Sequence, residues 1–181
     1  SVFIMNKHFK VYIDSSGVSL HKRGYRNKIH KASLNESLAA GLIMQSNWNK
    51  LDPFYDTMCG SGTLSIEAAL MAHNIAPGLL RNNFAFQKWY DYNDNLFKKI
   101  KKHAQDSISI NKDIKIYGFD LIFSNIAMAL YSARSLNLDK LLIFKKQDMQ
   151  HFNPKESKGT VIINPPYGER LNTDNDSLDL L

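Results

Sequence analysis

Apolar runs and helical periodicities alternate along this chain, and their order predicts an α/β fold. Four short apolar runs have strand character and are bounded by turn-forming residues. Between them, apolar residues recur at the spacing of a helix face. Strands that alternate with helices indicate a parallel sheet covered by helices on both faces. The strands are expected at 54–56, 114–120, 141–146 and 160–163.

The same periodicity predicts four helices. Ser33 and Glu36 have the spacing of a capping box in front of an apolar stripe, which places the first helix over 33–46. The second helix is expected to begin near residue 64, directly after a glycine-rich turn. The remaining two helices are expected at 93–108 and 124–136.

The first thirty residues have a different pattern, which predicts a small β-rich lead-in. Two short strands, 2–5 and 9–13, flank a turn at Asn6-Lys7. We therefore divide the chain into a lead-in over residues 1–30 and a partial Rossmann-like domain over residues 31–181. Because the chain begins without an initiator methionine and ends after a fourth core strand, we expect it to be part of a longer protein.

Composition narrows the function classes. The 181 residues include a single cysteine, which excludes internal disulfides and cysteine-rich zinc sites and favours a reducing, cytoplasmic setting. The six histidines show no metal-ligand spacing, so no metal is expected. No apolar run is long enough for a membrane span. A net charge of +6 favours a polyanionic partner such as nucleic acid.

Polar residues follow the first two core strands, at the edge where open α/β sheets bind ligands. Asp56 ends one strand, and Gly60-Ser61-Gly62 follows it at the start of a helix. Backbone amides at such a turn can bind a carboxylate or a phosphate. Asp56 suits a cationic amino group, and Asp120, at the end of the next strand, suits a ribose diol. These groups are two polar ends of S-adenosylmethionine, although the glycines alone could serve only a tight turn.

Two other classes of glycine turn fit less well. A phosphate-binding P-loop needs a lysine after its second glycine, where this chain has Thr63. The dinucleotide fingerprint needs a third glycine where Ser65 stands, and Asp120 lies far beyond the roughly twenty-residue separation of NAD-binding units. The turn therefore favours S-adenosylmethionine over P-loop or nicotinamide chemistry.

Asn164-Pro165-Pro166-Tyr167 follows the last apolar run and is the second chemical signal. Consecutive prolines stop a strand and hold a stiff loop with free carbonyls. The Asn164 side chain and the Pro165 carbonyl can accept hydrogen bonds from a planar amino group, while the Tyr167 ring can stack on the ring that carries it. Methylation of an exocyclic nitrogen on a nucleobase requires this combination.

Four motifs in order resemble a known enzyme family, and the match spans nearly the whole chain. They are the lead-in 14–26, the turn and helix 56–69, Ile75-Ala76-Pro77-Gly78-Leu79, and Asn164 to Leu171. In this order they are similar to the THUMP-associated RNA methyltransferases of UPF0020 type, above all to bacterial enzymes that methylate guanine N2 in large-subunit ribosomal RNA. The chain departs from the family at Thr57, where proline is usual.

The resemblance implies a Rossmann-like class I S-adenosylmethionine-dependent methyltransferase domain that acts on ribosomal RNA. The catalytic residues are expected to be Asn164, Pro165, Pro166 and Tyr167. The cofactor-binding residues are expected to be Asp56, Cys59, Gly60, Ser61, Gly62, Thr63, Asp120 and Asp148. For Asp148, which is assigned to the adenine amino group, capping of a loop is the alternative.

Arg23 and Arg26 flank Tyr25, and an arginine–aromatic cluster can pair phosphates and stack bases. These three residues are therefore candidate RNA-binding residues, with packing between lead-in and core as the alternative. The lysine run 98–102 could follow RNA phosphates or form a solvated helix face.

The expected function is methyl transfer to guanine N2 of large-subunit ribosomal RNA. Adenine-N6 methylation of nucleic acid and glutamine-N5 methylation of protein are alternatives, because enzymes of both kinds share the Asn-Pro-Pro-Tyr signature. A non-catalytic RNA-binding module on the same fold is a further alternative.

Overall fold

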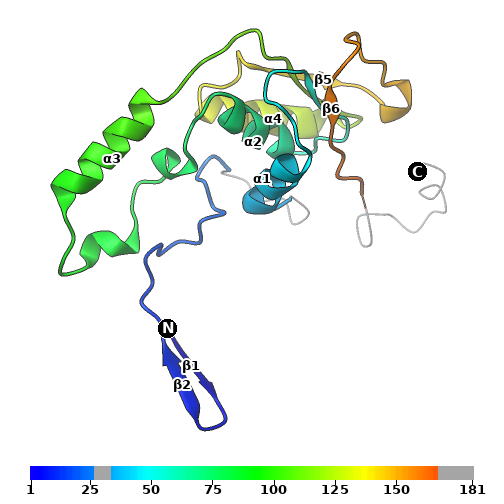
Figure 1. The fold of residues 1–181 in the computed structure, drawn as a ribbon. Coiled ribbons are helices and arrows are strands. Elements are labelled where there is room, and N and C mark those ends of the chain that lie inside the picture. Colours follow the sequence, from blue (N-terminus) through cyan, green and yellow to red (C-terminus); the bar gives the residue numbers. More distant parts are fainter. Residues whose placement is uncertain (27–33, 167–181) are drawn as a thin grey trace.

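The computed structural model describes residues 1–26 and 34–166, and its core is a four-stranded parallel sheet (Figure 1). The strand order is β5-β4-β3-β6, so the chain starts in the middle, moves outward to β5 and returns to the other side of β3. This return creates a topological switch point between β3 and β6, where open α/β sheets bind ligands. The strands are β3 (Phe54–Asp56), β4 (Ile116–Asp120), β5 (Leu142–Lys146) and β6 (Thr160–Val161).

All four predicted core strands and all four predicted helices are present, with small differences at their ends. The first helix begins at Glu36 rather than at Ser33, because the side chain of Asn35 caps it by accepting hydrogen bonds from the amides of Ser37 and Leu38. Ser33 lies outside the described residues, as does the predicted domain boundary at residue 30. The helices are α1 (Glu36–Gln45), α2 (Thr63–Ala72), α3 (Asp94–Asp106) and α4 (Phe123–Ser135).

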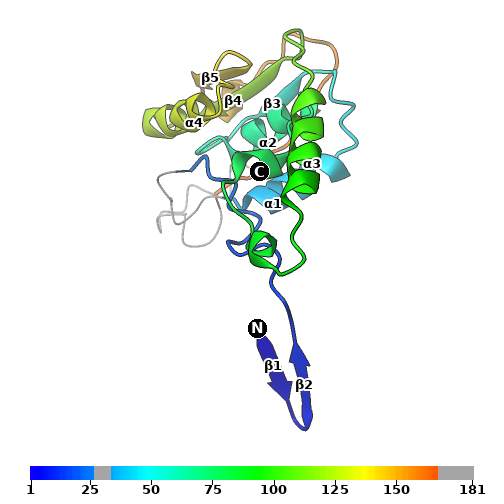
Figure 2. The same cartoon turned by 90° about the vertical axis from the view of Figure 1, so that its left-hand side faces the viewer.

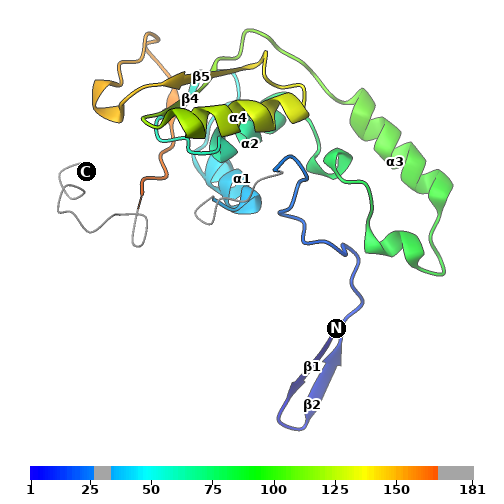
Figure 3. The ribbon, with the colours of Figure 1, turned by 180° about the vertical axis from the view of Figure 1, so that it is seen from behind.

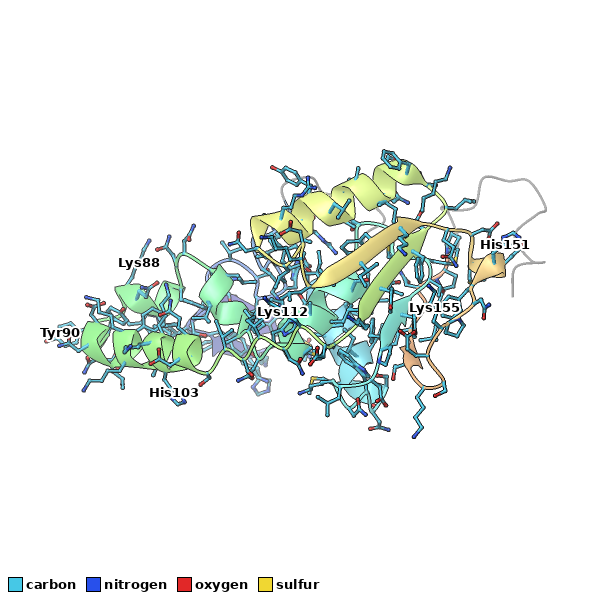
Figure 4. All side chains as sticks on the ribbon, turned by 90° about the horizontal axis from the view of Figure 1, so that it is seen from above. Lys88, Tyr90, His103, Lys112, His151 and Lys155 are labelled. Atoms are coloured by element: carbon cyan, nitrogen blue, oxygen red, sulfur yellow. The ribbon has the colours of Figure 1, made fainter. Side chains whose placement is uncertain are left out.

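Helices α1, α2 and α4 lie on one face of the sheet (Figure 2). Seen from above, the strands lie in front and no helix of the described residues covers them (Figure 4). The prediction of helices on both faces is therefore wrong for the described residues. Right-handed crossovers from β3 to β4 and on to β5 put both helices on the same face, whereas the return to β6 puts its connection on the other. That connection contains only the short 3-10 helix η3 (Met149–His151).

A loop covers part of the second face instead. The Phe152 ring packs against Tyr55 and Phe119, with centroids 5.2 and 6.1 Å apart. The hydroxyls of Tyr55 and Tyr117 both donate to the carboxylate of Glu156. Because these rings come from β3 and β4, the loop closes over the middle of the sheet.

The lead-in separates into two parts. Strands β1 (Val2–Met5) and β2 (His8–Val11) form an antiparallel hairpin that stands away from the body of the molecule (Figure 3). Every residue of the hairpin is exposed. The following segment is tied to the body by the buried guanidinium of Arg81, which donates to the backbone carbonyls of Ser16, Val18, Ser19 and Lys22.

Helix α3 lies on a projection beside the sheet, with Lys88 and Tyr90 at its outer end (Figure 4). Two 3-10 helices, η1 (Pro77–Leu80) and η2 (Ala85–Lys88), lead into it. An aromatic cluster holds the projection together and comprises Phe84, Phe86, Trp89, Tyr92 and Phe97.

Candidate functional site

The carboxyl ends of β3, β4 and β6 bring the predicted chemical residues to one edge of the sheet. Asp56 ends β3 and Asp120 ends β4. The Ile162 amide donates to the Tyr55 carbonyl at 3.0 Å, so the pairing of β6 with β3 continues just past β6. Continuing this register places Asn164 beside the turn that follows Asp56, directly at the switch point. Asn164, Pro165 and Pro166 are each partly exposed there, and Tyr167 lies outside the described residues.

The two glycines of the turn serve different purposes. Both have positive φ values, 53° at Gly60 and 79° at Gly62, which favour glycine. A Cβ on Gly62 would lie 2.8 Å from Cβ of Ala129, so this glycine lets α4 approach closely. A Cβ on Gly60 would meet nothing within 4 Å, so open space lies on its side-chain side. The sequence predicted a tight turn here, and the structure adds open space beside Gly60.

Asp120 holds the turn against the next strand. Its Oδ2 accepts a hydrogen bond from the Gly60 amide at 2.8 Å. Its Oδ1 accepts from the Ile122 amide at 2.8 Å and from the Asn125 side chain at 3.0 Å. These three hydrogen bonds give Asp120 a fixed orientation at the strand end and leave an acceptor site on Oδ2 for a hydroxyl group.

Asp56 is buried and forms no ion pair with any residue that the structure describes. It is 1 % exposed, and its Oδ2 accepts a hydrogen bond from the Ser65 hydroxyl at 3.2 Å. Its Oδ1 has no hydrogen-bond partner among the described residues. Burial raises the pKa of Asp56 from 3.8 to about 7, although the hydroxyl and amide of Ser65 and the amide of Met58 oppose the rise. A buried carboxylate in this state would gain from a cationic ligand.

Thr57, where the chain departs from the family pattern, lies in the turn directly after Asp56. It is 1 % exposed, and its hydroxyl has no hydrogen-bond partner within residues 1–26 and 34–166. Its neighbour Cys59 donates its amide to the Phe119 carbonyl at 2.7 Å, which links the turn to β4. Burial raises the pKa of the Cys59 thiol well above its usual range, so this cysteine is a small packing residue rather than a nucleophile.

Ser61, Thr63 and Asp148 are the other predicted cofactor-binding residues. Ser61 lies inside the turn, and Thr63 begins α2, where its hydroxyl accepts a hydrogen bond from Arg26. The side chain of Asp148 caps η3 by accepting from the Gln150 amide at 2.9 Å, which is the loop-capping alternative. Contact of Asp148 with an adenine amino group stays a prediction.

Of the three candidate RNA-binding residues, Tyr25 is buried, whereas Arg23 and Arg26 are partly exposed. Tyr25 is 2 % exposed and donates its hydroxyl to Glu67 at 3.1 Å, and Arg23 also pairs with Glu67. Arg26 reaches Thr63 and the Leu34 carbonyl. Tyr25 is therefore not available to stack on a base in this arrangement, and its contacts match the packing alternative. Contact of Arg23 and Arg26 with RNA stays a prediction.

Two of the lysines on α3 form ion pairs with aspartates of the same helix. Lys98 pairs with Asp94 at 2.6 Å and Lys102 with Asp106 at 3.3 Å, both on the exposed surface. These pairs support the solvated-face interpretation of the lysine run.

Residues 1–26 and 34–166 contain no group of three or more histidine, cysteine or acidic side chains that could hold a metal ion. Across the same residues, no helix is both long and apolar enough to cross a membrane.

The site's residues fit S-adenosylmethionine. Two buried polar atoms, Asp56 Oδ1 at the end of β3 and Thr57 Oγ1 in the turn, have no hydrogen-bond partner among the described residues, and the space at Gly60 is open. The oriented carboxylate of Asp120 lies at the neighbouring strand end. A ligand with an ammonium group at one end and a ribose diol further along would match this series of donors and acceptors.

Comparison with known proteins places the chain among methyltransferases. Residues 23–181 match the family of RMKL-like methyltransferase domains, UPF0020. The ribosomal RNA large subunit methyltransferase K/L of Psychromonas ingrahamii is 41 % identical over 175 residues, which are 94 % of this chain and 23 % of that protein. The K/L enzyme of Buchnera aphidicola is 38 % identical over 96 % of this chain and 26 % of its own length. The chain thus spans about a quarter of these relatives.

Solved structures agree on the fold. SMU.472, described as a methyltransferase and crystallised with SAH, superposes with a TM-score of 0.84 at 38 % identity and covers 92 % of this chain and 43 % of its own. A protein of Listeria monocytogenes, described as a predicted N6-adenine-specific DNA methylase, superposes with a TM-score of 0.79 at 38 % identity, over 87 % of this chain and 41 % of its own. Both confirm the predicted Rossmann-like α/β fold.

Proposed function

We propose that this chain, which belongs to the family of RMKL-like methyltransferase domains, binds S-adenosylmethionine and transfers its methyl group to an exocyclic amine of ribosomal RNA. One observation carries the proposal: the register of β6 on β3, continued past the strand ends, brings Asn164 to the switch point, beside the turn that follows the buried Asp56. A methyl acceptor and a cationic methyl donor would then meet at the same edge of the sheet.

The chain's own residues would hold the donor by its polar ends. Asp56 Oδ1 lacks a partner within residues 1–26 and 34–166 and is suited to the ammonium group. Asp120 is suited to the ribose hydroxyls because the Gly60 and Ile122 amides already orient its carboxylate. When bound, the donor supplies an electrophilic methyl group on a sulfonium centre.

The acceptor side requires positioning more than acid–base chemistry. An amino nitrogen on a nucleobase is a weak nucleophile because its lone pair is delocalised into the ring. The side-chain oxygen of Asn164 and the carbonyl of Pro165 would accept its two hydrogens, which favours a pyramidal nitrogen with its lone pair towards the methyl carbon. Stacking by Tyr167 on a base that has left its helix or loop is part of the same proposal.

Guanine N2 of large-subunit ribosomal RNA is the proposed acceptor, in a cytoplasmic setting. The names of the two K/L relatives support a large-subunit RNA substrate. The Listeria protein gives a specific reason to retain adenine N6 as a second candidate. Both acceptors present an amino group on a planar ring, so the Asn164 geometry serves either.

The test is transfer of a labelled methyl group from S-adenosylmethionine by the intact protein. Unmodified large-subunit ribosomal RNA, DNA and total protein are offered as acceptors, and the RNA is then digested to nucleosides. We expect label in N2-methylguanosine. Label in N6-methyladenosine would favour the second candidate, and label in protein alone would overturn the nucleic-acid assignment.

The matched variants are Asn164→Ala and Asn95→Ala. Asn164→Ala removes the side-chain oxygen that is proposed to accept a hydrogen bond from the base amino group, and it should lower the transfer rate on the order of a hundredfold. The second changes an exposed asparagine on α3 and should leave the rate unchanged. Wild-type protein that binds RNA but transfers no methyl group would support the non-catalytic alternative.

A further inference from the structure

The segment 23–26, here called the arm, lies along α2 and contacts two residues one helical turn apart. Thr63 and Glu67 are four positions apart, so they lie on the same face of α2. Arg23 and Tyr25 contact Glu67, whereas Arg26 contacts Thr63. The arm thus runs from the middle of α2 towards its start, where the glycine turn ends.

Glu67 is the anchor for the first half of the arm. It is 1 % exposed, and its Oε1 accepts from the Tyr25 hydroxyl at 3.1 Å and from Nε of Arg23 at 3.5 Å. Burial raises the pKa of Glu67, and the Arg23 charge and the Tyr25 hydroxyl oppose this rise. A buried carboxylate with both partners in place fixes the position of the arm on the helix.

Arg26 connects the arm to the starts of two helices. Its Nη2 donates to the Leu34 carbonyl at 2.7 Å and to the Thr63 hydroxyl. Its Nε lies 3.6 Å from Oε1 of Glu36, the first residue of α1, which is an ion pair but too long for a hydrogen bond. Arg26 is therefore held between α1 and α2 at the end of the cofactor turn.

The start of α2 needs this support. Its N-cap is Gly62, which has no side chain to accept from the first helical amides. The Arg26 contact fixes the hydroxyl of Thr63, the first helical residue, and so fixes the backbone that follows the glycine turn. On the other side, the Ser135 hydroxyl at the end of α4 lies 3.4 Å from the Tyr25 carbonyl, while its shorter contact, at 2.7 Å, is with the Ser132 carbonyl of its own helix.

We propose that Tyr25, Arg26 and Glu67 are positioning residues for the cofactor turn. They act through Thr63, so that cofactor affinity depends on how the arm packs against α2. This gives the lead-in a role in the catalytic domain that differs from direct RNA contact. The inference rests on the cofactor part of the proposed function and is independent of the RNA acceptor.

The test is calorimetric titration of the intact protein with S-adenosylhomocysteine, without RNA. Glu67→Gln removes the charge that holds Arg23 and Tyr25, and Arg26→Met removes the charged donor to Thr63, so each should weaken binding about tenfold. Arg26→Lys keeps the charge and should recover part of this loss. Tyr25→Phe removes a single hydroxyl and should have the smallest effect.

A double-mutant cycle separates positioning from general destabilisation. If Arg26 acts through Thr63, then Arg26→Met combined with Thr63→Val should weaken binding no more than the stronger single variant. Ile43→Val, a buried change in α1, is the control and should lower the melting temperature without a change in affinity.

The outcomes are distinguishable. Additive losses in the cycle, or arm variants that lower the melting temperature with unchanged affinity, would overturn the inference alone. Absence of binding by the wild-type protein would overturn the cofactor assignment and the inference with it.

Discussion

Two buried carboxylates close to each other in the chain have opposite surroundings. Glu67 and Asp56 are each 1 % exposed. Glu67 has a guanidinium and a phenol hydroxyl beside it. Asp56 has no ion pair among the described residues, and one of its oxygens has no partner there. Because an unpaired buried charge is unfavourable, the contrast separates a completed packing cluster from a site that lacks its cation.

The pH dependence of stability should show this contrast most strongly. Burial raises the pKa of Asp56 from 3.8 to about 7 in the folded protein, so its stabilising effect is complete below pH 4 and is lost as the pH rises through 7. The free energy of unfolding should fall by a few kcal/mol over this window relative to Asp56→Asn. Urea unfolding between pH 4 and 8 measures the difference, and parallel curves for the two proteins would contradict it.

Breaking the completed cluster should have the next largest effect. Arg23→Met leaves Glu67 buried without its cation and should lower the free energy of unfolding by about 3 kcal/mol. The control is Arg134→Met, which removes an exposed pair with Asp139 at 4.0 Å and should change stability by less than about 0.5 kcal/mol. Equal losses for the two variants in urea unfolding would show that the Glu67 cluster is not buried as described.

The two glycines of the turn should separate stability from affinity. Gly62→Ala would bring a Cβ within 2.8 Å of Ala129 and should destabilise the protein by about 2 kcal/mol. Gly60 also has a positive φ, but an added Cβ there would point into open space. Gly60→Ala should therefore lower the free energy of unfolding by only about 1 kcal/mol and should lower cofactor affinity instead. Thermal unfolding and cofactor titration of both variants test this, and the reverse order of effects would contradict the assignment of open space to the ligand.

The sequence was enough to predict the site around Asp56, but not the cluster around Glu67. Asp56, Asp120 and the glycine turn follow strands directly, so local pattern and the rule for strand ends were sufficient to place them together. The partner of Tyr25 could not be predicted, because Glu67 is 42 positions away and no periodicity links them. The same limit applies to Asp148, whose side chain could cap a loop or face a ligand, and to the sheet face that received a loop instead of helices.

The hairpin should show the smallest effect. Ile4 is 72 % exposed and contributes no packing to the described core, so Ile4→Ser should change the free energy of unfolding by less than about 0.5 kcal/mol. Ile43→Ala in α1, at 2 % exposed, is the buried counterpart and should cost about 3 kcal/mol. A large loss from Ile4→Ser would show that the hairpin packs against the body in solution.

The most direct measurement of the central claim is the affinity of Asp56→Asn for S-adenosylhomocysteine. The substitution keeps the size of the side chain and removes the charge that is proposed to pair with the ligand's ammonium group. At pH 8 we predict that the variant binds at least about tenfold more weakly than the wild type, while Asp106→Asn on α3 binds as the wild type does. Equal affinity of all three proteins would contradict the assignment of this edge as the cofactor site.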